Sequence, residues 1–293
     1  GAANGADLGG GAIVTGADLT RFDIPGVILR IWDGSVIDGV DARNGTVGVQ
    51  MAPCDDCVVR NSDLSGSGAG TGVELRVWCL YGESATGITI EDNSIADRAR
   101  GIQFWGHCDL HTPDAPTAVR RNQLTHVGTG IYFQDPWGGN YDGAVVSDNT
   151  LSGANPTDDP AAGIAASGTG GGLDIVRNTI VGFRNGLWLV HAPASRVAHN
   201  NVYDNHEWQA ASHLPVELSV EGEGNYWGRA CPAPLFVPGV DSNRIDVTDS
   251  FAYASPDAWR HGLRPGCNQP PVADAGPNRI VECGGPGGTT VTL

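Results

Sequence analysis

Apolar and polar residues alternate in short runs along the whole chain, and no run of helix-forming residues is longer than a few positions. Alternation with a period of two is typical of β-strands, because successive side chains point to opposite faces of a sheet. Gly, Asn, Asp and Pro separate the runs and favour turns. The pattern therefore predicts an all-β chain built from many short strands.

A unit of two parts recurs along the chain. In its first part an Asn lies between two apolar residues, in segments 90–95 (IEDNSI), 119–124 (VRRNQL), 146–151 (VSDNTL), 175–180 (IVRNTI) and 197–202 (VAHNNV), with 58–64 (VVRNSDL) as a looser copy. Its second part is a Gly followed by alternating residues, at Gly48, Gly72, Gly101, Gly130, Gly163 and Gly186. Successive glycines lie 23 to 33 residues apart, which fits one coil of a β-solenoid.

Stacking of these coils predicts a parallel β-helix. A single coil cannot bury its apolar side alone, whereas stacked coils place aliphatic residues on aliphatic residues and Asn on Asn. Each Asn is expected to bond the backbone of the neighbouring coil at a corner. Gly and Asn in every repeat argue against a helical solenoid, since both residues disfavour helices.

The repeats resemble those of right-handed parallel β-helix proteins, including the NosD-like group and the pectin-lyase-like enzymes, over about residues 25–228. Segment 224–228 (GNYWG) is similar to the terminal motif of NosD-like proteins, and its aromatic pair is expected to close the last coil. The resemblance implies an N-terminal segment or cap at 1–24, a β-helix at 25–228 and an irregular C-terminal cap at 229–267.

A second resemblance follows the cap. Segments 268–277 (NQPPVADAGP), 281–283 (VEC) and 289–293 (TTVTL) look like the opening strands of a PKD-type immunoglobulin-like domain. Because a complete sandwich needs about seven strands, residues 268–293 are expected to be the truncated start of such a domain in a longer modular protein. A flexible tail rich in Pro and Gly is the alternative.

The charge of the chain narrows the classes of partner. A net charge of -16 and a pI of about 4.6 disfavour nucleic acids and anionic membrane surfaces. All 17 basic residues are Arg, which excludes any mechanism that needs Lys. No apolar stretch reaches the length of about 18 residues that membrane insertion requires. We expect a bacterial protein that is secreted or held at the cell surface.

The cysteines add to this expectation, because seven of them fit disulfides in an oxidising compartment. The expected pairs, which leave Cys283 without a partner, are Cys54–Cys57, Cys79–Cys108 and Cys231–Cys267. A zinc site is the alternative for Cys54 and Cys57, although a second pair at ligand spacing is missing.

The strand after each repeated Gly predicts a binding surface. If the first and third residues after the Gly point inward, the second and fourth point outward. The outward residues are then Glu74, Arg76, Gln103, Trp105, Tyr132, Gln134, Ser167 and Trp188. Rings spaced by about 4.8 Å per coil can lie against sugar faces, while amides and charged groups bond hydroxyls or carboxylates. Packing of these rings beneath loops or against another subunit is the alternative.

The sequence contains candidate catalytic residues, but it does not contain the ordered set of catalytic motifs of a known enzyme class. A glycoside hydrolase needs two carboxylates, and Glu74, Asp109 and Asp135 are the candidates. The Asn-Thr-Asp, Asp-Asp, Gly-His-Gly and Arg-Ile-Lys series of pectin-degrading hydrolases is absent. A polysaccharide lyase would have to use Arg or His as its base in place of Lys, and Arg76, Arg98 and Arg100 are the arginines that keep this option open.

No cofactor is expected, and calcium is the one metal ion that the sequence leaves open. Calcium, which a lyase would need, has only scattered acids available at 158–159 and 241–246, and neither segment matches a calcium loop. His107 and His111 are four residues apart, but in a loop this spacing does not place both rings on one face.

Three hypotheses about function follow from these observations. The first is a non-catalytic module that binds a polysaccharide or cell-surface glycan through the aromatic and polar stripe. The second is a polysaccharide lyase or glycoside hydrolase, and the third is a structural stalk or adhesin repeat. Fold alone does not decide among them.

Overall fold

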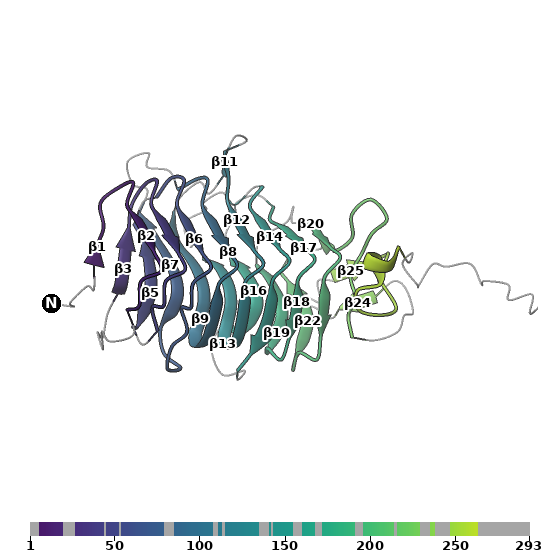
Figure 1. Ribbon diagram of the computed structural model, residues 1–293. Coiled ribbons are helices and arrows are strands. Elements are labelled where there is room, and N and C mark those ends of the chain that lie inside the picture. The colour runs from purple at the N-terminus through teal and green to yellow at the C-terminus, as the bar shows by residue number, and fades with distance from the viewer. Residues whose placement is uncertain are drawn as a thin grey trace, which may run out of the picture.

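The chain forms a parallel β-helix with a C-terminal cap, which confirms the fold that the repeats predict (Figure 1). The computed structural model describes residues 6–19, 27–43, 45–52, 54–78, 85–107, 111–112, 115–134, 141, 143–154, 160–167, 172–190, 196–213, 216–228, 235–237 and 247–262. Stacked coils already begin at residue 6, before the boundary at residue 25 that the repeats predict.

Two large parallel sheets make up the described part of the solenoid. The eight-stranded sheet, here called the first face, consists of β2 (Ile13–Thr15), β4 (Val36–Asp38), β6 (Val58–Arg60), β8 (Thr89–Glu91), β12 (Ala118–Arg120), β14 (Val145–Ser147), β17 (Asp174–Val176) and β20 (Arg196–Ala198). The twelve-stranded sheet consists of β1 (Ala6–Asp7), β3 (Val27–Ile31), β5 (Val47–Met51), β7 (Thr71–Trp78), β9 (Ser94–His107), β13 (Gln123–Gln134), β15 (Thr150–Gly153), β16 (Ala162–Ser167), β18 (Thr179–Val181), β19 (Asn185–Val190), β21 (Asn201–Tyr203) and β22 (Trp208–Ser212).

The twelve-stranded sheet bends into two further faces. The first part of β13 pairs with β15, whereas its last four residues pair with β16. The second face therefore contains β15, β18, β21 and the first parts of β9 and β13. The third face contains β1, β3, β5, β7, the last parts of β9 and β13, and then β16, β19 and β22.

Aliphatic ladders fill the interior. On the first face Ile90 pairs with Val119, which pairs with Val146, and all three are fully buried. On the third face the rings of Phe104 and Phe133 stack with their centroids 4.6 Å apart. The inward positions therefore form one continuous apolar core along the solenoid.

An asparagine ladder fixes the corner between the first and second faces. It runs through Asn93, Asn122, Asn149, Asn178, Asn200 and Asn225, each at most 2% exposed. The Nδ2 group of Asn122 donates to Asn149 Oδ1 at 3.0 Å and to the Ile90 carbonyl at 2.9 Å. Its backbone N–H donates to the same Asn149 oxygen at 2.9 Å. Each Asn thus binds the next coil through both side chain and backbone.

The two ends of the ladder depart from Asn for physical reasons. At the N-terminal end Ser62 takes the ladder position and accepts from the backbone N–H of Val40 at 3.1 Å. At the C-terminal end Asp249 Oδ2 accepts from Asn225 N at 2.8 Å and from Trp227 Nε1 at 2.8 Å. Asp249 Oδ1 accepts from Phe251 N at 2.9 Å. Each Asn of the ladder needs an acceptor in the next coil for its N–H groups. The carboxylate of Asp249 accepts at the end of the ladder and has no N–H group that would need a further acceptor.

Beside the ladder, exposed and half-buried side chains form a row that we call the charged ridge. It consists of the residues that precede ladder positions, with φ between 52° and 60°: Asn61, Asp92, Arg121, Asp148, Arg177 and His199. Opposite charges on neighbouring coils pair, as in Asp92–Arg121 and Asp148–Arg177, both at 2.8 Å. The hydrogen bond from Arg121 holds the pKa of Asp92 below its usual range. The ridge therefore adds coil-to-coil register on the outside of the corner.

The repeated glycines are required where the second face turns into the third. A Cβ on Gly101 would lie 2.2 Å from Leu124 Cδ2 and 2.6 Å from the Gly130 carbonyl oxygen. A Cβ on Gly163 would likewise lie 2.1 Å from Ile180 Cγ2. Because any side chain would collide with the next coil, the glycines let the coils bend and stack at the start of the third face.

A small cap closes the C-terminal end. Parallel β23 (Val216–Glu217) and antiparallel β24 (Leu235–Val237) flank β25 (Val247–Asp249). Trp227 of the GNYWG segment is 3% exposed and enters the core, whereas Tyr226 faces outward against Tyr203. The aromatic pair is thus divided, and only the indole closes the last coil. Short strands β10 (His111–Thr112) and β11 (Ala115–Pro116) form a separate hairpin, and a 3₁₀ helix spans Ala258–His261.

Replacing Asn149 by Ala tests the ladder. The change removes the acceptor of two Asn122 donors and the donor to the Val119 carbonyl. Leaving these buried groups unpaired is expected to lower the free energy of unfolding by about 3 kcal/mol. Chemical denaturation measures the loss, and Thr150→Ala at the exposed neighbouring position is the control. Equal stability of the two variants would contradict a stabilising role for the ladder.

Asp249 is expected to make stability fall as the pH rises. Burial raises its pKa from 3.8 to about 6, against the opposing hydrogen bonds from Trp227, Phe251 and Asn225. As the pH rises, the unfolded chain therefore loses this proton at a lower pH than the folded protein does. The stability that the protonated Asp249 contributes is fully present below pH 3.8 and is lost as the pH rises through about 6. Relative to Asp249→Asn, the wild type should lose about 3 kcal/mol between pH 3.5 and 7.

Thermal unfolding of both proteins across this range measures the difference. Carboxylates with lowered pKa values, such as Asp92, are common to both proteins and cancel. A stability difference that does not change with pH would show that Asp249 does not titrate in the folded state.

Candidate functional site

Two columns of outward side chains run along the third face. Strand register places the first column at Arg30, Gln50, Glu74, Gln103, Tyr132, Ala165, Trp188 and Ala211. It places the second column at Arg76, Trp105, Gln134, Ser167 and Val190. All the outward residues that the glycine spacing predicts therefore lie in these two adjacent columns.

The N-terminal part of the first column is a hydrogen-bonded chain. Arg30 donates to Gln50 Oε1 from Nε at 2.9 Å and from Nη2 at 2.6 Å. Gln50 Nε2 in turn donates to Glu74 Oε2 at 2.9 Å. Gln50 and Glu74 are each only 6% exposed although they point away from the core. They form a covered layer on the sheet that holds Arg30 in place.

Arg76 lies above this layer. Its Nη2 is 3.3 Å from Glu74 Oε1, and its guanidinium carbon lies 5.4 Å from the centre of the Trp105 ring. The Arg76 side chain is 55% exposed, whereas that of Glu74 is 8% exposed. The buried acid and the indole face thus position a cation that solvent can reach.

A second polar chain crosses the next coils. Arg100 Nη1 donates to Gln103 Oε1 at 3.2 Å, and Gln103 Nε2 donates to Gln134 Oε1 at 3.0 Å. Gln103 is 3% exposed, while Arg100 and Gln134 are half-buried. Here too a buried side chain fixes partly exposed polar groups.

The C-terminal part of the face is aromatic and uncharged. Tyr132 and Trp188 are half-buried, and the fully buried Ala165 lies between them in the column. Because Trp188 lies two coils further along the solenoid than Tyr132, the backbone positions of the two residues are about 10 Å apart. The Trp188 ring meets His213 edge-on with the centroids 6.0 Å apart.

Of the three candidate catalytic carboxylates, the structure places Glu74. Within the two columns as described, Glu74 is the only carboxylate, and its oxygens contact Gln50 and Arg76. Asp109 and Asp135 lie outside the described residues, so a role for them as a catalytic pair with Glu74 stays a prediction.

Arg98 has a structural role, unlike its neighbours Arg76 and Arg100. It is 2% exposed and donates to the carbonyls of Leu64 at 3.0 Å and Ser65 at 2.7 Å, and also to that of Gly45. Burial lowers the pKa of Arg98 to about 10. The guanidinium therefore ties two preceding coils together and does not face the columns.

No metal centre emerges in the part of the chain that the structure describes, where no three potential ligand side chains lie together. The side chains of His107 and His111, and the acids at 158–159 and 241–246, lie outside it. In the same part of the chain, no helix has the length and apolar character needed to cross a bilayer.

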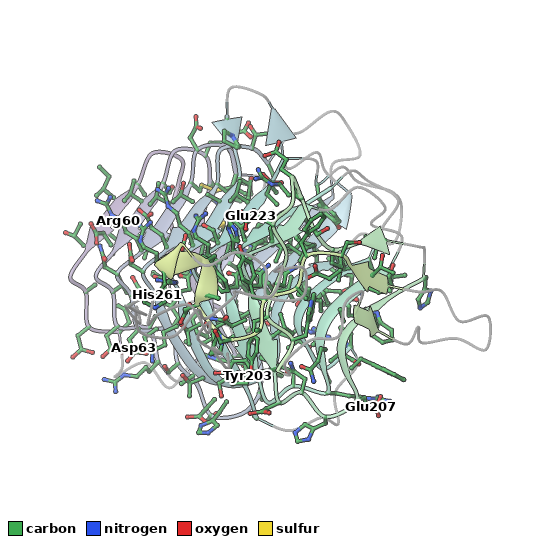
Figure 2. The ribbon with its side chains drawn as sticks, turned by 90° about the vertical axis from the view of Figure 1, so that its right-hand side faces the viewer. Arg60, Asp63, Tyr203, Glu207, Glu223 and His261 are labelled. Atoms are coloured by element: carbon green, nitrogen blue, oxygen red, sulfur yellow. A yellow bond between two sulfur atoms is a disulfide. The ribbon has the colours of Figure 1, made fainter. Side chains whose placement is uncertain are left out.

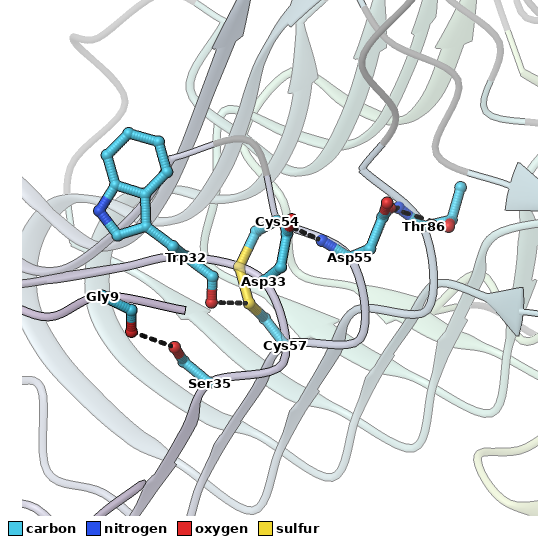
Figure 3. Close-up of a disulfide and its surroundings, with 8 residues drawn as sticks. All are labelled: Gly9, Trp32, Asp33, Ser35, Cys54, Asp55, Cys57 and Thr86. Atoms are coloured by element: carbon cyan, nitrogen blue, oxygen red, sulfur yellow. Dashed lines mark hydrogen bonds between the residues drawn. A yellow bond between two sulfur atoms is a disulfide. The ribbon is translucent and has the colours of Figure 1, made fainter. Parts of the chain in front are cut away.

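One disulfide, Cys54–Cys57, forms in a turn beside the third face (Figure 3), as predicted. Since the two sulfur atoms bond each other, this turn is not a zinc site. Asp33 Oδ1 accepts from Asp55 N at 2.9 Å, and Asp55 Oδ1 accepts from Thr86 N at 2.7 Å. The turn is thus tied to the coils on both sides. The other four cysteines of the predicted pairs, Cys79, Cys108, Cys231 and Cys267, lie outside the described residues.

The sequence pattern missed three residues of the polar network. Arg30 was missed because the residue two positions before it is Ile28 and not a Gly. Its strand pairs with β5, which does contain a repeated glycine, Gly48. Gln50 follows Gly48 by two positions, so the same glycine rule could have found it. Arg100, considered from the sequence only as a base for a lyase, comes directly before Gly101, and its bond to Gln103 shows that it belongs to this network.

The comparison with known families agrees with this architecture. Residues 26–206, more than half of the chain, match the model of the right-handed beta helix region. The chain therefore belongs to the right-handed β-helix family. No curated protein matches the sequence.

Replacing Arg98 by Met tests its structural role. The change keeps an unbranched side chain but leaves the carbonyls of Leu64, Ser65 and Gly45 without their donor. Unfolding by denaturant should show a loss of about 3 kcal/mol. Arg100→Met, on the half-buried arginine of the same strand, should cost under about 1 kcal/mol. A larger loss from Arg100→Met would refute the distinction.

Proposed function

We propose that the chain is a non-catalytic module that binds an extracellular polysaccharide or cell-surface glycan along its third face. The observation that carries the proposal is the pair of outward columns, which contain half-buried Trp105, Tyr132 and Trp188 together with hydrogen-bonding side chains. Aromatic faces stack on the apolar faces of sugar rings, while amides and guanidiniums bond hydroxyl groups.

The buried layer beneath the columns supports binding. Gln50, Glu74 and Gln103 are at most 6% exposed and hold Arg30, Arg76 and Arg100 before any ligand arrives. Side chains that are already ordered lose less conformational entropy on binding. A stalk would have no need of such an ordered polar surface on one face.

Catalysis is the less supported alternative. Hydrolysis needs a second carboxylate near Glu74, and the candidates for it, Asp109 and Asp135, lie outside the described residues. Of the three arginines considered for a lyase, Arg76 is paired with Glu74, Arg98 is bound to backbone carbonyls and Arg100 donates to Gln103.

The disulfide supports the proposed location. A Cys54–Cys57 bond is stable in oxidising compartments and rare in the bacterial cytosol. We therefore place the module outside the cell. Its attachment to a PKD-type domain is part of the same proposal, and residues 263–293 lie outside the described part of the chain.

A panel of neutral and acidic polysaccharides, with and without calcium, tests the function. Retention of the protein is measured together with new reducing ends and the absorbance of unsaturated products. Retention without cleavage is the expected result, and cleavage would overturn the non-catalytic assignment.

The double variant Trp105→Ala, Trp188→Ala locates the binding surface. Loss of both rings should weaken retention at least about tenfold, because each removes a stacking surface. Tyr203→Ala is the control, since Tyr203 is a half-buried aromatic residue of β21 on the second face. Thermal unfolding checks that each variant is folded. Equal losses in the variant and the control would place binding elsewhere.

A further inference from the structure

Among the described residues, the arginines of the third face have few carboxylates to compensate their charge. Arg30 and Arg100 are held by the neutral amide oxygens of Gln50 and Gln103. Glu74 is the only carboxylate in this network, where it contacts Arg76. Three guanidiniums therefore face one carboxylate, on a chain whose net charge is -16.

Arginines on and beside the first face, in contrast, form ion pairs with acidic residues. Arg60, Arg120 and Arg177 each pair with an acid of the preceding coil, Asp38 at 2.9 Å, Glu91 at 2.7 Å and Asp148 at 2.8 Å respectively. Their side chains are 43% to 45% exposed, close to the 55% of Arg76. In the end-on view, Arg60 lies on the opposite side of the solenoid from Glu207, which precedes β22 of the third face (Figure 2).

Unused donors remain on the third-face arginines. A guanidinium has five N–H donors in a planar fork that suits carboxylate and sulfate groups. Arg30 bonds through Nε and Nη2, which leaves Nη1 without an acceptor among the described residues. Arg100 bonds only through Nη1 within the same residues. The amides thus orient the cations but do not neutralise them.

We propose that the N-terminal part of the third face, through Arg30, Arg76 and Arg100, selects polysaccharides that carry carboxylate or sulfate groups. The proposal rests on glycan binding at this face and adds the chemical class of the ligand. The aromatic part around Tyr132 and Trp188 then contacts uncharged portions of the same polymer.

Affinity for four polymers tests the charge selection. Polygalacturonate supplies carboxylates, carboxyl-reduced polygalacturonate is its neutral match, and dextran sulfate and dextran form the second pair. At low salt each acidic polymer that binds should do so at least about tenfold more tightly than its neutral match, and added salt should reduce the difference. If the protein prefers the acidic polymer in only one of the two pairs, that pair identifies whether carboxylate or sulfate is the group that is recognised.

The triple variant Arg30→Gln, Arg76→Gln, Arg100→Gln should lose this preference, so that its affinity for each acidic polymer falls to about that for the neutral match. The triple variant Arg60→Gln, Arg120→Gln, Arg177→Gln removes the same charge from the other side and should keep the preference within about twofold. Thermal unfolding confirms that both are folded.

Failure of the charge selection differs from failure of glycan binding. Equal affinity for acidic and neutral polymers, with retention still sensitive to Trp105→Ala and Trp188→Ala, would overturn the selection and leave the proposed function standing. An equal loss of preference in the two triple variants would show only a general charge effect and would also overturn it. If no polymer is retained, both proposals fail.

Discussion

The asparagine ladder is the interaction on which the rest of the structure depends. Each buried Asn bonds the backbone and the side chain of its neighbours, so a coil shifted by one residue would leave several buried polar groups unpaired. Such a shift would also exchange inward and outward side chains. The ladder therefore fixes the register that brings Glu74, Gln103 and Tyr132 into one column.

A second constraint is that each position of the coil needs a side chain with suitable hydrogen-bond donors, acceptors or charge. Asn suits the inside of the ladder because it both donates and accepts, whereas Asp249 suits the end because it only accepts. On the outside, acids pair with arginines along the charged ridge, while amides hold arginines on the third face. The same scaffold thus has one side on which charge is cancelled and one side on which it is kept.

Periodicity was sufficient to predict the fold and the outward columns, because the alternation of residues and the repeated Gly report backbone geometry directly. It could not predict contacts that run between coils at irregular positions. Asn61 matched the repeated Asn, yet Ser62 takes the ladder position and Asn61 lies on the ridge. Arg98 looked equivalent to Arg100, but its burial against carbonyls of earlier coils depends on the bend within β9, where Asp97 has a φ of 53°.

Hydroxyl-radical footprinting tests most directly whether the third face is the binding surface. Oxidation of side chains is compared with and without a polysaccharide that retains the protein. The account predicts protection of Trp105, Tyr132 and Trp188, with no change at Tyr203 of the second face or at Tyr226 beside it. Protection of Tyr203 or Tyr226 with an unchanged third face would contradict it.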